Sequence, residues 1–381
     1  MALLRIKLWT LVALILVSCD GVVGGNARSD GTGSGGGGYI HLFEVSPDTG
    51  WLAYTRSQLT DRVLLHRISS GETINLSLFG TGYGRDLSAR PVLVQRLAFS
   101  PSGRQMLVQA QVGGEMSPMA IILIDLQTFS RRQFFQPDRL YRDVVFHSEN
   151  ELAYLRSPEQ LGHMQTVRLE ALFDERAFSA FDGFAGYLTR LDLRSLEERE
   201  FFEVIDDPRP HWINITWAGS IGDGRLVIGA RSWDLSACGA GTRDYEDGFT
   251  RDSVYFFVRP NADGVSGGCD GAIEVREIGG QYMGVLPETG AVVTKTADGN
   301  YTLDGEDWTT LNAVRESLQT LRAHGAVTPR IAFARDAVVL LSQAKNDTVN
   351  VRVCDLSDYI CNSFEVDETQ ATDLFAAPDP L

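Results

Sequence analysis

Cys19 is the residue whose surroundings point most directly to a chemical reaction. Arg5 and Lys7 give the N-terminal segment a basic start, and an almost unbroken apolar run follows from Leu8 to Val17. The run is too short to span a bilayer as a stable helix, and it is typical of a cleaved export signal. It closes on a tetrapeptide with a small residue before a thiol, Leu16-Val17-Ser18-Cys19. A thiol in this position can take up a diacylglyceryl group before the preceding peptide bond is cut.

This tetrapeptide fits the bacterial lipobox at each position and resembles the cleavage signal of bacterial lipoproteins. The resemblance implies that residues 1–18 are a signal peptide and that Cys19 is lipidated. The mature chain is then anchored to a membrane of the cell envelope and faces the periplasm or the exterior. The alternative is an ordinary export signal that happens to end in cysteine. The rest of segment 19–38 is rich in Gly and Ser, which predicts a flexible linker.

Four further cysteines remain, and an even number in an exported chain is typical of two disulfides. Cys354 and Cys361 stand on two predicted neighbouring strands joined by a short turn, which brings their thiols close. Cys238 and Cys269 are then paired by elimination, although three connectivities exist for four cysteines. Metal ligation is the rival hypothesis, but no Cys-x-x-Cys or Cys/His spacing supports it. We therefore predict no metal site and no cofactor.

No residue emerges from the sequence as catalytic. The six histidines are scattered without a pair at ligand spacing, which favours ordinary surface or packed side chains. The segment Asp298–Asp304 suggests a calcium loop, but Leu303 and Thr309 stand where an EF-hand needs glycine and glutamate. A hairpin turn explains this segment better. Acidic runs such as 197–200 are typical of solvated turns, and one sequence does not give the carboxylate separation that glycoside hydrolysis needs.

Aromatic side chains gather in two stretches that interrupt the strand pattern. Four phenylalanines lie in segment 158–185, and Trp233 opens segment 233–252. Either packing on the rim of the domain or contact with a partner explains so many phenylalanines in a loop. In the second case the expected anchors are Phe178, Phe181, Phe184 and Trp233, because large aromatic side chains supply much of the energy of an interface.

The charge of the chain excludes one class of partner. The formal net charge is −16 and becomes −18 when Arg5 and Lys7 leave with the signal. Nucleic acid and anionic lipid repel such a chain, and no basic cluster opposes this effect. We therefore expect no nucleic-acid partner.

The elements that must position these residues are short strands in a repeated pattern. Segments 43–54 and 97–108 match one another: each holds an alternating strand, a turn that begins with Ser-Pro, and a second apolar strand. A third and a fourth strand follow each copy, at Val63–Ser69 and Thr73–Leu78, and at Ala120–Asp125 and Arg131–Gln136. Alternation with period two and turn residues at the breaks predict a four-stranded antiparallel meander.

Weaker copies of the first two strands continue along the chain. They are Val144–His147 with Glu151–Arg156, Ile213–Trp217 with Arg225–Ala230, Met283–Leu286 with Ala291–Thr296, and Ile331–Ala334 with Ala337–Ser342. A lone meander cannot bury both of its faces, so six units within residues 39–366 predict an all-β fold with a single β-propeller. We expect six blades, while poorly formed outer strands near Tyr301–Trp308 leave a count of seven open. Residues 367–381 are expected to form a C-terminal tail.

Three insertions break the rhythm of the strands, at 158–185, 233–252 and 310–324. The pattern favours short helices at Leu169–Ala177 and at 310–324, the latter capped by Thr309. In an up-and-down blade, the connection from the second to the third strand emerges on the same face as the link to the next blade. The three insertions are therefore expected to share one face. The same topology puts Cys238 and Cys269 at opposite ends of a strand, so their pairing requires the second insertion to fold back.

The turn residues Phe99–Gly103 and the strand end Ile124–Leu126 resemble the repeats of TolB-type, WD-like periplasmic β-propellers. The resemblance extends over the repeated region and is specific in the first two units. It implies a protein-binding platform in the envelope. It does not extend to TolB itself, in which an α/β domain precedes the propeller, whereas here the Gly-rich segment leads directly into the first unit.

The function that we expect is a lipid-anchored, non-catalytic propeller that binds another cell-envelope protein through its loop-bearing face. One alternative is a propeller hydrolase or lyase that acts on a sugar or peptidoglycan fragment in the central channel, and another is a structural spacer. An arginine with carboxylates at the channel mouth would favour the enzyme. A wide apolar face rimmed by the insertions would favour the binding protein.

Overall fold

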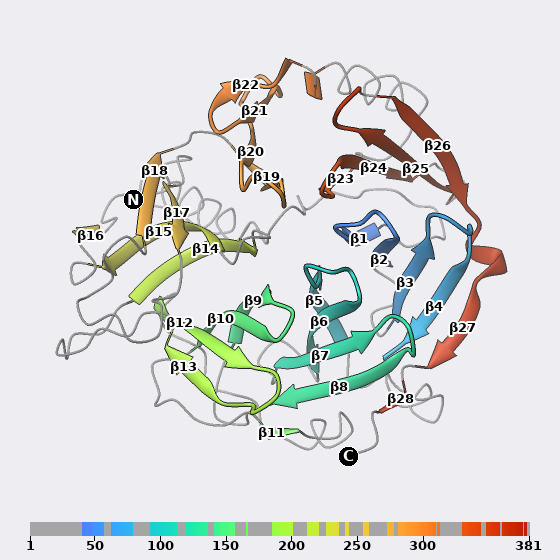
Figure 1. The fold of residues 1–381 in the computed structure, drawn as a ribbon, viewed down its shortest axis with the longest axis horizontal. Coiled ribbons are helices and arrows are strands. Elements are labelled where there is room, and N and C mark those ends of the chain that lie inside the picture. The colour runs from blue at the N-terminus through green and yellow to red at the C-terminus, as the bar shows by residue number, and fades with distance from the viewer. Residues whose placement is uncertain are drawn as a thin grey trace, which may run out of the picture.

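The computed structural model arranges its strands as sheets around a ring, with the first strand of each meander nearest the centre (Figure 1). The described residues are 40–56, 62–78, 92–112, 119–135, 141–156, 165–166, 185–200, 212–220, 226–235, 241–243, 254–258, 273–277, 281–309, 311–312, 330–343, 348–358, 360–375 and 377–378. Within these ranges the strands form five hydrogen-bonded sheets. The predicted class, an all-β propeller, is confirmed.

The first two sheets are meanders that are extended at their outer edges. From the centre outward, the first sheet holds β1 (Ile40–Val45), β2 (Trp51–Arg56), β3 (Arg62–Arg67), β4 (Thr73–Ser77) and β27 (Thr372–Phe375). The second holds β5 (Val92–Phe99), β6 (Gln105–Val112), β7 (Met119–Asp125) and β8 (Ser130–Phe135), with β11 (Gln165–Thr166) and β28 (Ala377–Pro378) both paired to β8. Both predicted four-strand repeats are confirmed, because turn chemistry and alternation mark each strand end.

The third sheet has nine strands and contains two consecutive meanders. The first is β9 (Tyr141–Ser148), β10 (Glu151–Arg156), β12 (Ala185–Asp192) and β13 (Glu198–Glu200). The second is β14 (Trp212–Ser220), β15 (Leu226–Leu235), β17 (Val254–Val258) and β18 (Ile273–Glu277), with β16 (Gly241–Arg243) paired to β15. Strands β12 and β14 join the two meanders at Ala185 and Gly186.

The fourth and fifth sheets have four strands each. The fourth holds β19 (Gln281–Val285), β20 (Val292–Lys295), β21 (Tyr301–Leu303) and β22 (Glu306–Asp307), whose outer strands are as short as the sequence predicts. The fifth holds β23 (Arg330–Phe333), β24 (Ala337–Gln343), β25 (Val349–Asp355) and β26 (Cys361–Val366).

Helical structure is scarce in the part of the chain that the structure describes. One short 3-10 helix, η4 (Glu368–Gln370), follows β26. The segment predicted as a helix at 310–324 is described only at its start, where the Asn312 N–H donates to the Trp308 carbonyl at 3.0 Å. The predicted helix at Leu169–Ala177 lies outside the described residues.

A repeated hydrogen bond ties the two turns of a meander together. The residue that follows the third strand donates its N–H to the turn between the first and second strands. The donor and acceptor pairs are Ile68 with Gly50, Leu126 with Arg104, Leu193 with Asn150, and Leu356 with Asp336. In three of these copies an aspartate ends the third strand, at Asp125, Asp192 and Asp355, and its Oδ1 accepts N–H groups of the next turn. The Asp-Leu pairs at the ends of these strands therefore stabilise the neighbouring turns through hydrogen bonds.

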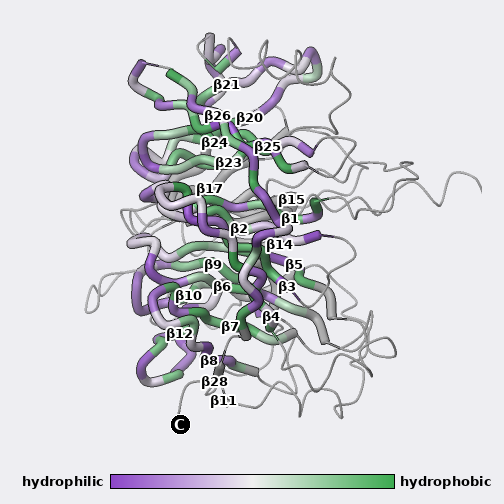
Figure 2. Tube along the Cα trace, turned by 90° about the vertical axis from the view of Figure 1, so that its right-hand side faces the viewer, coloured by the Kyte–Doolittle hydropathy of each residue, from purple (hydrophilic) through white to green (hydrophobic). Residues whose placement is uncertain are grey.

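Apolar side chains pack between neighbouring sheets, which makes the ring a series of interfaces. One cluster lies between the first and second sheets, with Leu65 and Val108 among its members. A second joins the second sheet to β9–β12 through Phe134 and Phe146. A third lies between the first and fifth sheets and includes Tyr54, and a fourth joins the fourth and fifth sheets around Trp308. Seen from the side, hydrophobic segments lie within the ring and hydrophilic turns gather at one end (Figure 2).

The ring meets itself where the fifth sheet adjoins the first. Arg330 donates to the Ile40 carbonyl at 2.9 Å, and the Ile40 N–H donates to Gln343 Oε1 at 3.2 Å. No strand is shared between β1–β4 and β23–β26 in the described structure. Instead, the C-terminal segment runs from β26 past this junction, and β27 lies parallel to β4 at the rim (Figure 1). Residues 367–381 are predicted from the sequence as a C-terminal tail, and the structure places η4, β27 and β28 within them.

Candidate functional site

Most of the predicted site residues lie outside the described ranges. These are Cys19, Cys238, Cys269, Phe178, Phe181 and Phe184. Trp233 is described through its backbone, which lies in β15 and pairs with Ile213 of β14 and Arg243 of β16. The second strand of this meander therefore extends to Leu235, and Trp233 belongs to its last residues rather than to a loop.

The predicted disulfide between Cys354 and Cys361 is confirmed. The two residues face one another across the antiparallel pair β25 and β26, at the end that leads into the turn. Cys354 is buried in the cluster around Trp308, and Cys361 packs at its edge. Their predicted strands and the short closing turn are as expected, so local geometry was sufficient to pair them.

The strand directions give the ring two different ends. Turns between first and second strands, such as 46–50, 100–104 and 334–336, close at one end together with the turns 68–72, 126–129 and 193–197. Because neighbouring strands are antiparallel, each second strand finishes at the opposite end. Strands β10 and β15 stop there at Arg156 and Leu235, and β23 starts there at Arg330. We call this second end the connection face.

The longest connections leave from the connection face with one exception, although short connections such as 57–61 and 344–348 lie at this face as well. The long segments 157–184 and 236–253 depart from the connection face, as does 313–329 before β23. The segment 259–272, which contains Cys269, instead joins β17 to β18 at the turn end. The short turn 296–300 lies at the connection face. Cys238 and Cys269 therefore belong to segments that start at opposite ends of β17, as the strand pattern predicts.

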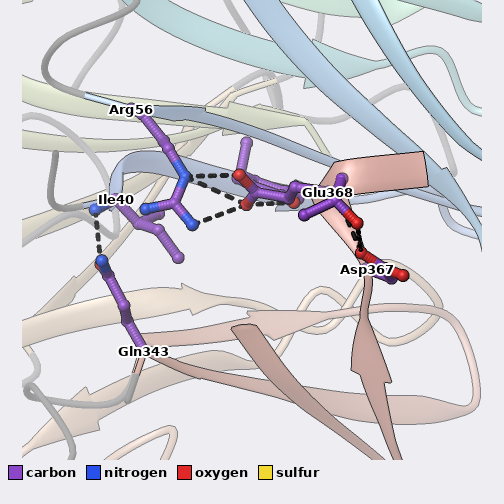
Figure 3. Close-up of polar contacts among 7 residues, drawn as sticks. Ile40, Arg56, Gln343, Asp367 and Glu368 are labelled. Carbon is purple, nitrogen blue, oxygen red and sulfur yellow. Dashed lines mark hydrogen bonds and ion pairs between the residues drawn. The ribbon is translucent and has the colours of Figure 1, made fainter. Parts of the chain in front are cut away.

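A cluster of polar side chains lies at the connection face, where the first and fifth sheets meet. The Glu368 carboxylate accepts hydrogen bonds from Arg56 Nε at 2.8 Å and Nη2 at 2.7 Å, and from the Tyr54 hydroxyl at 2.8 Å. The Arg56 side chain is only 7% exposed and that of Glu368 is 24% exposed. Figure 3 shows Arg56 and Glu368 directed towards one another, with Ile40 and Gln343 paired beside them.

The surroundings of Tyr54 in this cluster keep its hydroxyl protonated. Burial, followed by the charge of Glu368 and its hydrogen bond, raises the pKa of Tyr54 well above its usual value. Tyr54 therefore stays protonated and acts as a donor. An almost buried guanidinium is costly without a partner, and Glu368 supplies that partner.

A signal for this cluster exists in the sequence but was missed. Leu52-Ala53-Tyr54-Thr55-Arg56 recurs as Leu152-Ala153-Tyr154-Leu155-Arg156. In a strand, residues two apart share a face, so each copy places a tyrosine and an arginine on one side of the sheet. The second copy binds a glutamate as the first does, because the Tyr154 hydroxyl donates to Glu198 at 2.8 Å.

A second set of polar groups lies on the innermost strands. Burial raises the pKa of Glu44, on β1, to about 7, although the positive charge of Arg96, on β5, acts in the opposite direction. A carboxyl group that titrates near neutrality can give or take a proton. The pair is thus the described arrangement nearest to the arginine and carboxylate that an enzyme in the channel would need.

Two of the histidines that the structure describes, His66 and His147, are buried. His66 contacts Thr73 and stacks on Phe364. His147 bonds Glu151 at 3.1 Å, and this hydrogen bond is the main reason why the pKa of Glu151 lies below its usual value. Among the described residues, no three His, Cys, Asp or Glu side chains are grouped to hold a metal ion. No helix within the same residues is long and apolar enough to cross a membrane.

One further motif bears on catalysis. Gly264-Val265-Ser266-Gly267-Gly268 fits the G-x-S-x-G pattern of serine hydrolases. In those enzymes the serine stands on a sharp turn between a strand and a helix. Here the motif falls in the connection between two antiparallel neighbours, β17 and β18, outside the described residues. The two described strands that flank the motif are antiparallel neighbours, whereas a nucleophile elbow leads from a strand into a helix.

Comparison with known proteins gives no family. No protein-family model matches the sequence, and no curated protein matches it. Among solved structures, TolB from Acinetobacter baumannii aligns over 90% of this chain and 58% of its own, with 10% identity and a TM-score of 0.35. A structure from a study of two prolyl endopeptidases aligns over 86% of this chain and 41% of its own, with 10% identity and a TM-score of 0.41. The propeller domain of the Trilobed protease from Pyrococcus furiosus aligns over 86% and 84%, with 12% identity and a TM-score of 0.41.

These likenesses are to propellers of the TolB and prolyl oligopeptidase kind, at low identity. The chain spans 58% of the TolB chain and 41% of the endopeptidase chain. Identities of this size speak to the fold alone.

Proposed function

We propose that this protein is a lipid-anchored β-propeller of the bacterial cell envelope that binds another envelope protein through its connection face and performs no catalysis. Lipidation at Cys19 rests on the match of residues 16–19 to the lipobox. The propeller then stands at the membrane surface on the Gly-rich segment. Its acidic charge favours a protein partner over nucleic acid or a bare anionic membrane.

The observation that carries this proposal is the difference between the two ends of the ring. Hydrogen-bonded tight turns close one end. The three segments singled out for their aromatic or amphipathic residues depart from the other. Segments held by a rigid scaffold commonly carry binding functions, and aromatic anchors contribute most of the energy in such contacts.

We also propose that the ring has six blades. The third sheet supports this count, since it contains two consecutive four-stranded meanders that only β12 and β14 link. Counting these meanders separately gives one blade for each of the six sequence repeats.

The test replaces Phe178, Phe181, Phe184 and Trp233 together by Ser. The full-length variant is expressed in its native host, cross-linked in intact cells, and its partners are quantified by mass spectrometry. A matched control is Ile360→Ser, because Ile360 is 63% exposed and lies in a turn at the opposite end. We expect the quadruple variant to lose its main partner at least about tenfold, as expected for the loss of anchors, while Ile360→Ser retains it. Unfolding of the quadruple variant would mean that these aromatics pack in the domain. A folded variant with unchanged partners would refute the proposed face.

The anchor has a separate test. Cys19→Ser should give a form that no longer incorporates labelled fatty acid or partitions into detergent. Equal behaviour of the wild-type and variant chains would refute lipidation.

A second candidate function is supported by Glu44 and Arg96. These residues could serve a hydrolase or lyase that acts on a sugar or peptidoglycan fragment within the ring, with Glu44 exchanging the proton. Incubation with peptidoglycan fragments should then give new products, and Glu44→Gln should abolish them. Equal product patterns with and without the protein would remove this candidate and leave the binding protein or a structural spacer.

A further inference from the structure

The junction between the first and fifth sheets lacks the direct polypeptide connection that joins consecutive sheets elsewhere in the ring. Consecutive sheets are joined by the polypeptide that leads from one meander to the next. The first and fifth sheets are the ends of this series, and among the described residues the chain passes between them only after Val366. A ring with one unlinked junction opens there first unless something else spans it.

Residues 367–375 span this junction, and we call them the C-terminal segment. Asp367 caps η4 by accepting the Thr369 N–H at 2.9 Å, which fixes the direction of the chain as it leaves β26. Glu368 then reaches Arg56 and Tyr54 of β2 (Figure 3). The segment continues as β27, whose four residues pair in parallel with Ile74–Ser77 of β4.

Side chains add to this pairing on the first sheet. Asn75 Nδ2 donates to Asp373 Oδ1 at 2.7 Å, and Arg62 lies 3.6 Å from the same oxygen. Leu374 packs against the cluster between the first and second sheets. Beyond the segment, β28 pairs with β8, so the chain end reaches the second sheet as well.

Much of the segment is nevertheless exposed to solvent. Thr372 and Asp373 are exposed, and Leu374 is only partly buried. Elements with few buried apolar contacts open at lower cost than the core. The least exposed polar contact is the one that Glu368 makes with Arg56.

We infer that residues 367–375 are a releasable clasp that closes the ring across the junction between β1–β4 and β23–β26, and that the contact of Glu368 with Arg56 and Tyr54 is its lock. Release of the clasp frees the outer edge of β4 and leaves the junction held by the apolar cluster that includes Tyr54, by the bond from the Arg335 N–H to the Pro47 carbonyl, and by that of Ile40 with Gln343. The ring can then open at this junction while its other interfaces stay packed. This inference does not depend on the identity of the partner.

Hydrogen exchange of the full-length protein, read by mass spectrometry, tests the clasp. Two variants are compared with wild type: Glu368→Gln, which removes the charge and keeps the shape, and a chain that stops after Asp367. Glu365→Gln is the matched control, since Glu365 is an exposed carboxylate on β26 that takes no part in the lock. The amides of β1 and β23 report on the junction, and those of β9 and β10 report on a remote interface.

We expect the shortened chain to exchange its β1 and β23 amides at least about tenfold faster than wild type, with β9 and β10 unchanged. Glu368→Gln should show a smaller increase at the same strands, and Glu365→Gln none. Unchanged exchange in β1 and β23 would overturn the inference, as would an equal increase in β9 and β10. An equal increase of exchange in β1 and β23 in Glu365→Gln would refute the role of Glu368 as the lock. If the shortened chain does not fold, the comparison of the two glutamate variants decides.

Discussion

Two equivalent turns need a left-handed backbone conformation at the same position, and they have different residues there. In the turns that begin at Ser46 and Ser100, the serine N–H donates to the carbonyl five residues later, at Trp51 and Gln105. The fourth residue of each turn has a left-handed backbone, with a φ of 55° at Thr49 and 72° at Gly103. Glycine adopts this conformation without strain, whereas a β-branched residue does not.

Substitutions at these two positions should therefore act in opposite directions. A Cβ added at Gly103 would lie 2.9 Å from Asp48 Oδ1, so Gly103→Ala should lower the free energy of unfolding by about 1–2 kcal/mol. Thr49→Gly should raise it by up to about 1 kcal/mol. Urea unfolding of both variants measures the difference. Destabilisation by Thr49→Gly would show that the Thr49 hydroxyl, which donates to the Asp48 carbonyl at 2.7 Å, matters more than backbone strain.

His66 gives the protein a dependence on pH at the junction of the first and fifth sheets. Its side chain is 2% exposed and stacks on Phe364 of β26, and burial lowers its pKa from 6.5. The unfolded chain therefore binds a proton more readily than the folded one. The stability due to neutral His66 is complete above pH 6.5 and is lost as the pH falls from there towards the lowered pKa.

We expect wild type to lose more stability between pH 7 and pH 5 than His66→Gln does. Urea unfolding at several pH values measures this, and the carboxylates common to both chains cancel in the comparison. Parallel pH profiles for the two chains would contradict the role of His66.

At the scale of elements, the hairpin of β25 and β26 carries the disulfide. Its sequence separation is 7 residues, so the loss of chain entropy on closure is small. Cys361→Ser should lower the free energy of unfolding by about 2 kcal/mol at most, as measured by urea unfolding. The difference from wild type should vanish in the presence of a reductant. Peptide mapping without reductant should recover Cys354 linked to Cys361, and a different partner for either would contradict the structure.

Strands whose partners are near in the sequence could be predicted, and those with remote partners could not. Alternation and Ser-Pro turns located β1, β2, β5 and β6, because each hairpin carries its own turn chemistry. Nothing local marks β27, whose partner β4 lies about 300 residues earlier, since Asp373 bonds Asn75 at a separation of 298. The extension of β15 through Trp233 was missed because β16, which covers it, lies in the predicted insertion. Glu368 was missed as the partner of Tyr54 and Arg56 for the same reason as β27, since it lies 314 residues after Tyr54.

At the scale of the whole molecule, the two ends of the ring differ. Apolar clusters between sheets hold the ring, and tight turns bonded to one another close one end. The other end holds the clasp and the points from which the long segments depart. Under the proposed function, this division would let residues of the long segments vary without loss of the core.

Photo-crosslinking from the two ends of the ring in living cells tests the proposed function most directly. A photoreactive amino acid is placed at Phe181, in the long segment after β10, or at Ile360, in the turn at the opposite end. We predict that position 181 links to one envelope protein and position 360 does not. Links to the same protein from position 360 alone, or none from position 181 in a folded and lipidated chain, would contradict it.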